Sequence, residues 1–223
     1  MRVSKVIGAA IAAAFLSTSA GALPLEITDL TVSARNNVTV TAAPAGVPTG
    51  DFTASGFTFE FGLDSFVAWC FDLQHTISLG ASLDYEVTET PFSNSFLAPG
   101  AKERMGNLFN AAYDEVDPFD VIDATAFQMS IWEVAYDTGF DLANGAFLAT
   151  SSVAGAVARA VDFLSAANGF SGPKQWDLLF LESQETPTTQ NLVSAAPVPL
   201  PASAPLLLGA ICGSVAYGRR RKR

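Results

Sequence analysis

The first half of the chain alternates hydrophobic and polar residues with the two-residue period of a β-strand. In residues 56–62, GFTFEFG, every phenylalanine is followed by a polar residue or by glycine, as expected of a strand with one buried face. Residues 65–73, SFVAWCFDL, follow after a short break, so the two segments are predicted to form a hairpin. Three further segments have strand-like patterns: 25–34, 37–42 and 82–90.

From residue 101 the hydrophobic residues recur with the period of a helix instead. The first predicted helix spans 101–113. A second begins with Asp117 as its N-cap, followed by proline at the first helical position, and runs to about Asp137. A third spans about 152–167, with Val161 on its apolar face and an Asn-Gly pair closing it.

Residues 174–182, KQWDLLFLE, return to a strand pattern. Strands, then helices, then a strand again predict an α+β fold. We expect a β-rich half, resembling a sandwich or a barrel, with an inserted helical half of about three helices. This body should cover residues 23–190, with a linker at 191–197 and separate segments at both ends.

The N-terminal segment, residues 1–22, has the pattern of a secretory signal peptide. Arg2 and Lys5 precede an apolar run, and Ala20-Gly21-Ala22 is a small-residue cleavage pattern. The alternative is a retained anchor, but the apolar run is short for a membrane span. The sequence therefore predicts export and cleavage near Ala22.

The C-terminal segment, residues 198–223, joins a Pro-rich entry to a short apolar stretch and a run of cations. The entry and the cationic run are Val198, Pro199, Leu200, Pro201, Ala202 and Arg219, Arg220, Arg221, Lys222, Arg223. Cations directly after an apolar helix hold that end in the cytoplasm. A plain C-terminal membrane anchor, with a short transmembrane helix, is one interpretation.

This tail also resembles the VPLPA variety of PEP-CTERM sorting signals, found in Gram-negative bacteria that make exopolysaccharide. The resemblance covers the tail alone. It implies recognition by an exosortase in the inner membrane, then release to the cell surface or extracellular matrix. It implies a destination and no activity.

Between the two ends the chain is strongly acidic. Seven of the 12 lysines and arginines lie in the end segments, so five remain against 22 aspartates and glutamates, a net charge of −17. Such a chain is repelled by nucleic acid and by anionic lipid. Nucleic-acid binding is therefore excluded, and the pattern indicates no cofactor.

Cys70 is the one cysteine of the body, and Gln128 lies in the middle of an apolar helix. Taken separately, Cys70 is explained as a small buried hydrophobe and Gln128 as a buried amide bonded to backbone carbonyls. Taken together they suggest a reaction, in which a thiol attacks a glutamine carboxamide, expels ammonia and leaves a thioester. Such an electrophile needs an apolar enclosure, for which the sequence offers these side chains: Trp69, Phe71, Phe127, Ile131 and Trp132.

The same two segments resemble the signatures of bacterial Cys–Gln thioester adhesin domains. The aromatic-Cys-aromatic step WCF and the later run QMSIW carry the resemblance, which covers about residues 60–185. Ser130 stands where an alanine is usual in the family, and Phe127 where a threonine is common. The resemblance implies covalent capture of an amine, such as a protein lysine, by Gln128 with release of Cys70. A single-use tether of this kind is not an enzyme.

Other interpretations remain open at this stage. A surface or matrix structural protein of the same fold, without a thioester, is one alternative, and an enzyme is another. Cys70 and His75 suggest a cysteine-hydrolase pair, but five positions apart in a strand they face opposite ways. The acidic residues between 114 and 123 suggest Ca²⁺ binding, yet no loop of the EF-hand pattern is present.

Overall fold

The computed structural model describes residues 22–61, 64–88, 90 and 96–198 of the 223-residue chain. Its strands are β1 (Leu23–Leu30), β2 (Val38–Ala42), β3 (Gly50–Phe52), β4 (Gly56–Phe61), β5 (Asp64–Cys70), β6 (Ser82–Thr88), β7 (Leu148–Ser151), β8 (Trp176–Ser183) and β9 (Leu192–Pro197). Its helices are α2 (Ala101–Ala112), a 3₁₀ turn (Tyr113–Glu115), α3 (Val121–Tyr136) and α4 (Ala156–Asn168).

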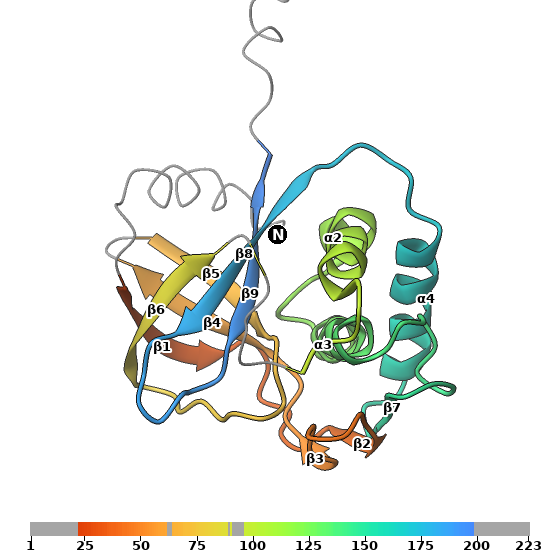
Figure 1. The fold of residues 1–223 in the computed structure, drawn as a ribbon, viewed down its shortest axis with the longest axis horizontal. Coiled ribbons are helices and arrows are strands. Elements are labelled where there is room, and N and C mark those ends of the chain that lie inside the picture. Colours follow the sequence, from red (N-terminus) through yellow and green to blue (C-terminus); the bar gives the residue numbers. More distant parts are fainter. Residues whose placement is uncertain (1–21, 62–63, 89, 91–95, 199–223) are drawn as a thin grey trace, which may run out of the picture.

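Six strands close into an antiparallel barrel in the order β1-β4-β5-β9-β8-β6. The helices are inserted between β6 and β8 and pack beside the barrel, as Figure 1 shows. The expected α+β fold with a barrel-like half and an inserted helical half is therefore confirmed. A second, three-stranded sheet, β3-β2-β7, lies below the helices and was not expected.

The predicted hairpin is present, with β4 and β5 paired from Gly56–Trp69 to Phe61–Asp64. The alternating pattern explains it, because Phe57 and Phe59 are buried while Glu60 is exposed. The segments at 25–34 and 37–42 also contain strands, but β1 joins the barrel and β2 joins the small sheet.

Segment 191–197, expected as a linker, is instead mostly strand. β9 pairs with β8 along its length and with β5 at Trp69 and Cys70, so it closes the barrel. Its residues are buried by both neighbours, and for that reason they lack the polar and hydrophobic alternation of a half-exposed strand. The folded body therefore extends to residue 197.

Two helix details differ from the sequence expectation. The N-cap of α3 is Asp120 rather than Asp117, because the Asp120 carboxylate accepts the N–H groups of Ile122 and Asp123. On α4, Val161 is exposed, and the buried face is formed mainly by alanines with Phe163 and Leu164. The small alanine side chains let α4 lie close to its neighbours.

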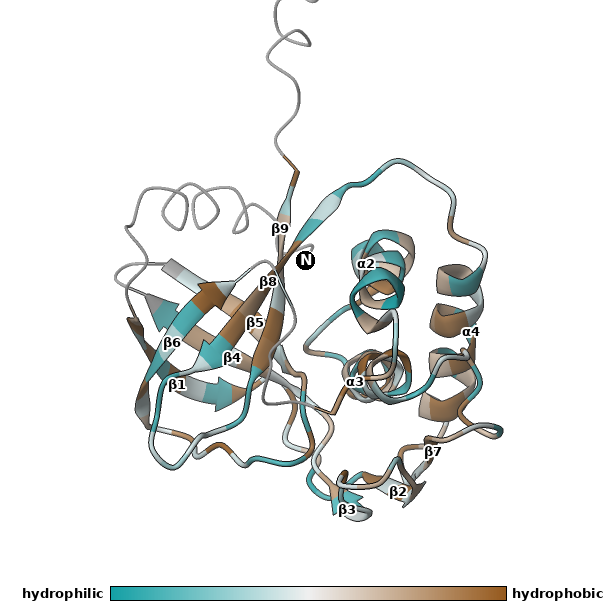
Figure 2. Cartoon of the chain, viewed as in Figure 1, coloured by the Kyte–Doolittle hydropathy of each residue, from teal (hydrophilic) through white to brown (hydrophobic). Residues whose placement is uncertain are grey.

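One continuous hydrophobic core joins the barrel to the helices. Residues 124–136 of α3 are all buried, since the helix lies between α2, α4, the barrel and the small sheet. Figure 2 shows hydrophobic residues along β5 and β9, whereas α2 carries both hydrophilic and hydrophobic residues. The middle of α3 is therefore shielded from water on every side.

Candidate functional site

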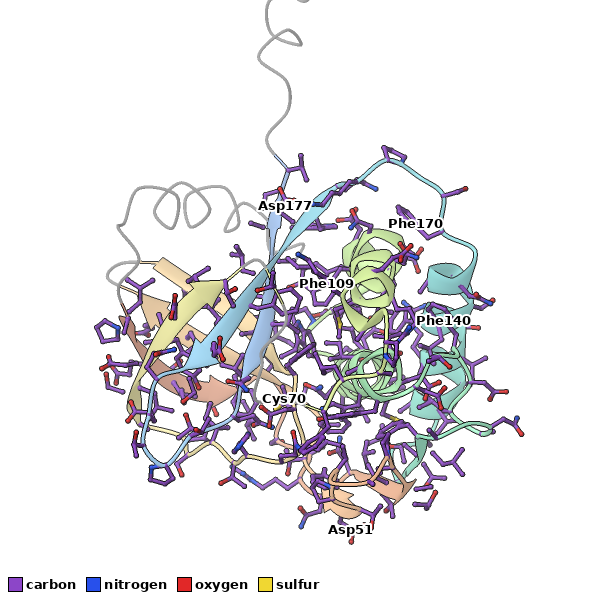
Figure 3. All side chains as sticks on the ribbon, in the orientation of Figure 1. Asp51, Cys70, Phe109, Phe140, Phe170 and Asp177 are labelled. Atoms are coloured by element: carbon purple, nitrogen blue, oxygen red, sulfur yellow. The ribbon has the colours of Figure 1, made fainter. Side chains whose placement is uncertain are left out.

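The structure brings Cys70 and Gln128 together at the junction of barrel and helices. The Cys70 main-chain N–H donates to Gln128 Oε1 at 2.9 Å, and Gln128 Nε2 donates to the Cys70 main-chain oxygen at 2.7 Å. Both residues are buried, with Gln128 fully inaccessible and Cys70 2% exposed. Figure 3 shows Cys70 between the barrel and the helical half. The side-chain amide is thus paired, on both its donor and acceptor sides, with one residue of a strand.

The end of β4 explains why Cys70 has main-chain groups to offer. The ladder between β4 and β5 stops at the pair Gly56–Trp69. Phe71, the residue that follows Cys70 and the end of β5, donates its N–H to the Asn191 main-chain oxygen on the β9 side. Main-chain groups of successive residues point to opposite edges, so the N–H and C=O of Cys70 point to the edge that β4 has left free. The Gln128 carboxamide fills this edge as the backbone of another strand would.

The aromatic side chains proposed for the enclosure are buried residues of β5, of α3 and of the segment that follows β5. Trp69 packs edge-on against Phe127, with ring centroids 5.0 Å apart. The rings of Phe71 and Phe180 pack against each other with their centroids 5.4 Å apart. Trp132 lies one turn beyond Gln128 on α3. Its ring packs against that of Phe52, with the centroids 6.0 Å apart. Ile131, like these side chains of β5 and α3, is fully buried or nearly so.

Two buried tyrosines lie near the thiol. Tyr136 of α3 accepts the Leu73 N–H at 2.8 Å through its hydroxyl oxygen. Tyr85 of β6 donates its O–H to the Gln190 main-chain oxygen at 3.0 Å. Burial raises the pKa of both hydroxyls, and the nearby Cys70 and Asp72 raise it further. Both tyrosines therefore stay neutral hydrogen-bonding groups.

The thiol is held in its neutral form. Burial raises the pKa of Cys70 well above its usual value, and the negative charge of Asp72 raises it further. A hydrogen bond at Cys70 lowers the pKa but does not outweigh these effects. Any reaction of this thiol must therefore move its proton as the sulfur attacks.

Asp72 is a site residue that sequence reasoning did not single out. Its side chain is fully buried, and Oδ1 accepts the His75 main-chain N–H at 3.0 Å and lies 3.1 Å from His75 Nδ1. Oδ2 accepts the Asn191 N–H at 3.1 Å. An acid directly after an apolar strand was the available signal, but charged residues at that place are more often solvated.

The other candidate groups form ion pairs with neighbouring side chains. His75 pairs with Asp72, and no hydrogen bond joins it to Cys70 in the described part of the chain. Asp123 pairs with Arg159 at 2.9 Å, and Glu115 lies 3.6 Å from the same guanidinium. Within the described ranges, no group of three or more His, Cys, Asp or Glu side chains is arranged to hold a metal ion.

Both end segments fall almost wholly outside the described residues. Residues 1–21 and 199–223, and with them the signal-peptide and sorting-signal interpretations, are not described. Within the described ranges no helix combines the length and apolar character needed to cross a membrane.

No family model matches the sequence, and no curated protein matches it. Several solved structures are similar in fold. The N-terminal domain of the Streptococcus pyogenes pilus tip adhesin Cpa aligns at a TM-score of 0.43 and 15% identity, covering 75% of this chain and 97% of that one. The N-terminal thioester domain of fibronectin-binding protein SfbI from Streptococcus pyogenes aligns at 0.42 and 13%, covering 73% and 94%. The N-terminal thioester domain of a Clostridium perfringens surface protein aligns at 0.40 and 12%, covering 73% and 99%. Since each of these TM-scores is below 0.5, the function of this chain has to be argued from its own residues.

Proposed function

We propose that this protein is an exported adhesion domain in which Cys70 and Gln128 form an internal thioester that captures an amine covalently. The observation that carries the proposal is the pair of hydrogen bonds between the Gln128 carboxamide and the Cys70 main chain, at 2.9 and 2.7 Å. These bonds hold the carboxamide against the residue that bears the thiol. Because the fold holds the two groups side by side, they do not have to find each other by diffusion before they react.

The direction of approach also favours attack by the sulfur. Strand side chains project out of the plane in which the main-chain groups form their hydrogen bonds. The Gln128 carboxamide lies at the edge of β5 and bonds to main-chain groups, so the Cys70 side chain stands to one side of it. A nucleophile reaches a carbonyl carbon from such a face rather than along the edge of the group.

The Cys70 N–H would stabilise the negative charge that develops during the attack. As sulfur bonds to the carboxamide carbon, charge accumulates on Gln128 Oε1, which already accepts this N–H at 2.9 Å. The C–N bond then breaks, the thiol proton passes to the nitrogen, and ammonia leaves. The products are one thioester and one ammonia, and the buried aromatic surroundings keep water from hydrolysing the bond.

Capture would consume the thioester. An amine of the target attacks the Gln128 carbonyl carbon, the C–S bond breaks, and the products are an amide on Gln128 and a free Cys70 thiol. The target is an amine-bearing surface or matrix component such as a protein lysine. Since each molecule reacts once, the domain is a tether and not an enzyme.

The expected location comes from the two ends of the chain. The signal peptide at 1–22 and the tail at 198–223 support export through the inner membrane, exosortase recognition, and display at the cell surface or in the extracellular matrix. The net charge of −17 on the body agrees with a domain that stays soluble outside the cell.

A structural matrix protein without a thioester is the second candidate, and one observation favours it. The Gln128 carboxamide already satisfies the Cys70 N–H and C=O, so the pair can join the barrel to α3 through hydrogen bonds alone. In this case Cys70 contributes to stability through its main-chain hydrogen bonds and through the packing of its small buried side chain.

Intact mass decides between the candidates. Residues 23–197, which contain every described strand and helix, should be lighter than their calculated mass by one ammonia, and Cys70 should resist alkylation after denaturation. Incubation with methylamine should add one methylamine to the mass and free the thiol. A full-mass protein with an alkylatable Cys70 would leave only the structural candidate.

Paired substitutions provide a second test, because Gln128 bonds the main chain of Cys70 and not its side chain. Without a thioester, Cys70→Ser leaves both hydrogen bonds in place and should change stability little. Gln128→Ala should cost about 1–3 kcal/mol for each main-chain group left unpaired. With a thioester, each single change removes a cross-link worth roughly 3–4 kcal/mol, and the double variant should lose little more. A small effect of Cys70→Ser in a thermal unfolding cycle would contradict the thioester.

A further inference from the structure

The buried carboxylate of Asp72 lies two residues beyond the reactive cysteine. Its three hydrogen-bond contacts are the main-chain N–H groups of His75 and Asn191 and the ring nitrogen Nδ1 of His75, all at 3.0–3.1 Å. Gln190 Nε2 also donates to the Asp72 main-chain oxygen at 2.8 Å. This segment is thereby fixed to the start of β9, and the carboxylate cannot swing out to solvent.

The charge on Asp72 lacks a permanent cationic partner. No lysine or arginine forms an ion pair with it in the described part of the chain, where His75 is its only basic neighbour. A buried carboxylate without a counter-charge is costly. A cation that enters the site would therefore supply the positive charge that the Asp72 carboxylate lacks in the folded protein.

Asp72 shares its surroundings with the groups of the proposed reaction. Its charge acts on Cys70 at the end of β5, on Tyr85 of β6 and on Tyr136 of α3. Glu185, which follows β8, also acts on Tyr85. No positive charge among these groups opposes Asp72. The side chain of His75 is 25% exposed, so it links the buried carboxylate to solvent.

We propose that Asp72 and His75 act as the proton acceptor for amine capture, so that the site selects alkylamines that enter as ammonium ions. This inference rests on the proposed thioester. The ammonium pairs with the Asp72 carboxylate and gives one proton to the Asp72–His75 pair, and the neutral amine attacks the Gln128 carbonyl carbon. As the C–S bond breaks, a second proton passes from the nitrogen to Cys70 Sγ. One ammonium and one thioester give one amide, one thiol and one proton, which leaves through His75.

The test uses the full exported protein and two probes, methylamine and hydroxylamine. Methylamine is a cation at neutral pH and must lose a proton before it attacks, whereas hydroxylamine is already neutral. His75→Ala alters a partly exposed side chain and is expected to fold, and Asp72→Asn is the second variant. Asp177→Asn, which removes a surface carboxylate paired with Lys174, is the control. Intact mass first establishes the thioester in each protein.

In His75→Ala the rate of methylamine capture at pH 7 should fall by roughly 10²-fold, the usual contribution of a positioned base. The rate with hydroxylamine should stay within about threefold of the original protein. Asp72→Asn, which removes the carboxylate and keeps a side chain of the same shape, should lower the methylamine rate in the same way. Equal changes for both probes, or none, in a variant that retains the ammonia mass deficit would overturn the proton-acceptor role alone. Full mass in the unaltered protein would overturn the thioester together with this role.

Discussion

Glu133 offers a direct test of the electrostatics inside the helical half. It lies in the last turn of α3 and is fully buried. Oε1 accepts the Asp141 N–H at 2.9 Å, while Oε2 has no hydrogen-bond partner among the described residues. Burial raises the pKa of Glu133 from 4.5 to about 7, and the nearby charges of Asp137 and Asp141 add to the shift. The carboxyl group is therefore most stable in the fold when it is protonated.

The sign of the resulting pH dependence follows from proton binding. The folded state binds this proton more tightly than the unfolded state, so its contribution to stability is complete below pH 4.5 and is lost as the pH rises through about 7. The shift of about 2.5 pKa units, at 1.36 kcal/mol for each unit, sets an upper value of about 3 kcal/mol. Arg104 lowers the pKa and moderates the effect. We expect a loss of about 2–3 kcal/mol between pH 4.5 and pH 8.

Glu133→Gln removes the titrating group and keeps an oxygen for the Asp141 N–H. The comparison is the free energy of unfolding in urea for the variant and the original protein at pH 5 and at pH 8.5. Relative to the original protein, the variant should be about 2 kcal/mol more stable at the higher pH than at the lower. Glu103→Gln, which changes an exposed carboxylate of α2, is the control. A difference between variant and original protein that is the same at both pH values would refute the buried, titrating carboxyl.

Two further substitutions test how the helical half is held. Gly145 has a φ of +132°, and a Cβ there would overlap the Asp137 carboxylate. Gly145→Ala should therefore lower the free energy of unfolding by more than about 2 kcal/mol. An unchanged midpoint of urea unfolding would contradict this. Asn110 ties α2 to the start of β8, accepting the N–H groups of Gln175 and Trp176 and donating to the Trp176 carbonyl. Asn110→Ala should cost about 2–4 kcal/mol in the same assay, whereas Asn110→Asp, which keeps the two accepted bonds, should cost less.

The hydrophobic pattern of the sequence predicted strands and helices well where one face of the element is exposed to water. It predicted them poorly where the element is buried on both faces. The β4–β5 hairpin was recognisable because phenylalanines alternate with polar residues. β9 gives no such signal, since Leu192, Val193 and Ser194 are all buried between two neighbouring strands. On α4 the expectation that Val161 lies on the buried face was wrong, because that face is formed mainly by alanines, whose hydrophobic signal in the sequence is weak.

For the candidate site as well, some features could be predicted from the sequence and others depend on the tertiary structure. A glutamine within an apolar helix indicates a buried amide that needs a donor and an acceptor, and this much follows from residue types alone. Its actual partner depends on where β4 begins. The ladder stops at Gly56, where an added Cβ would lie only 2.8 Å from the Val67 side chain and 3.1 Å from that of Thr31, so this position has no room for a side chain. The end of this pairing leaves the edge of β5 open at Cys70, where α3 presents Gln128. The need for a partner is therefore local and visible in the sequence, whereas the choice of the Cys70 main chain arises from tertiary structure.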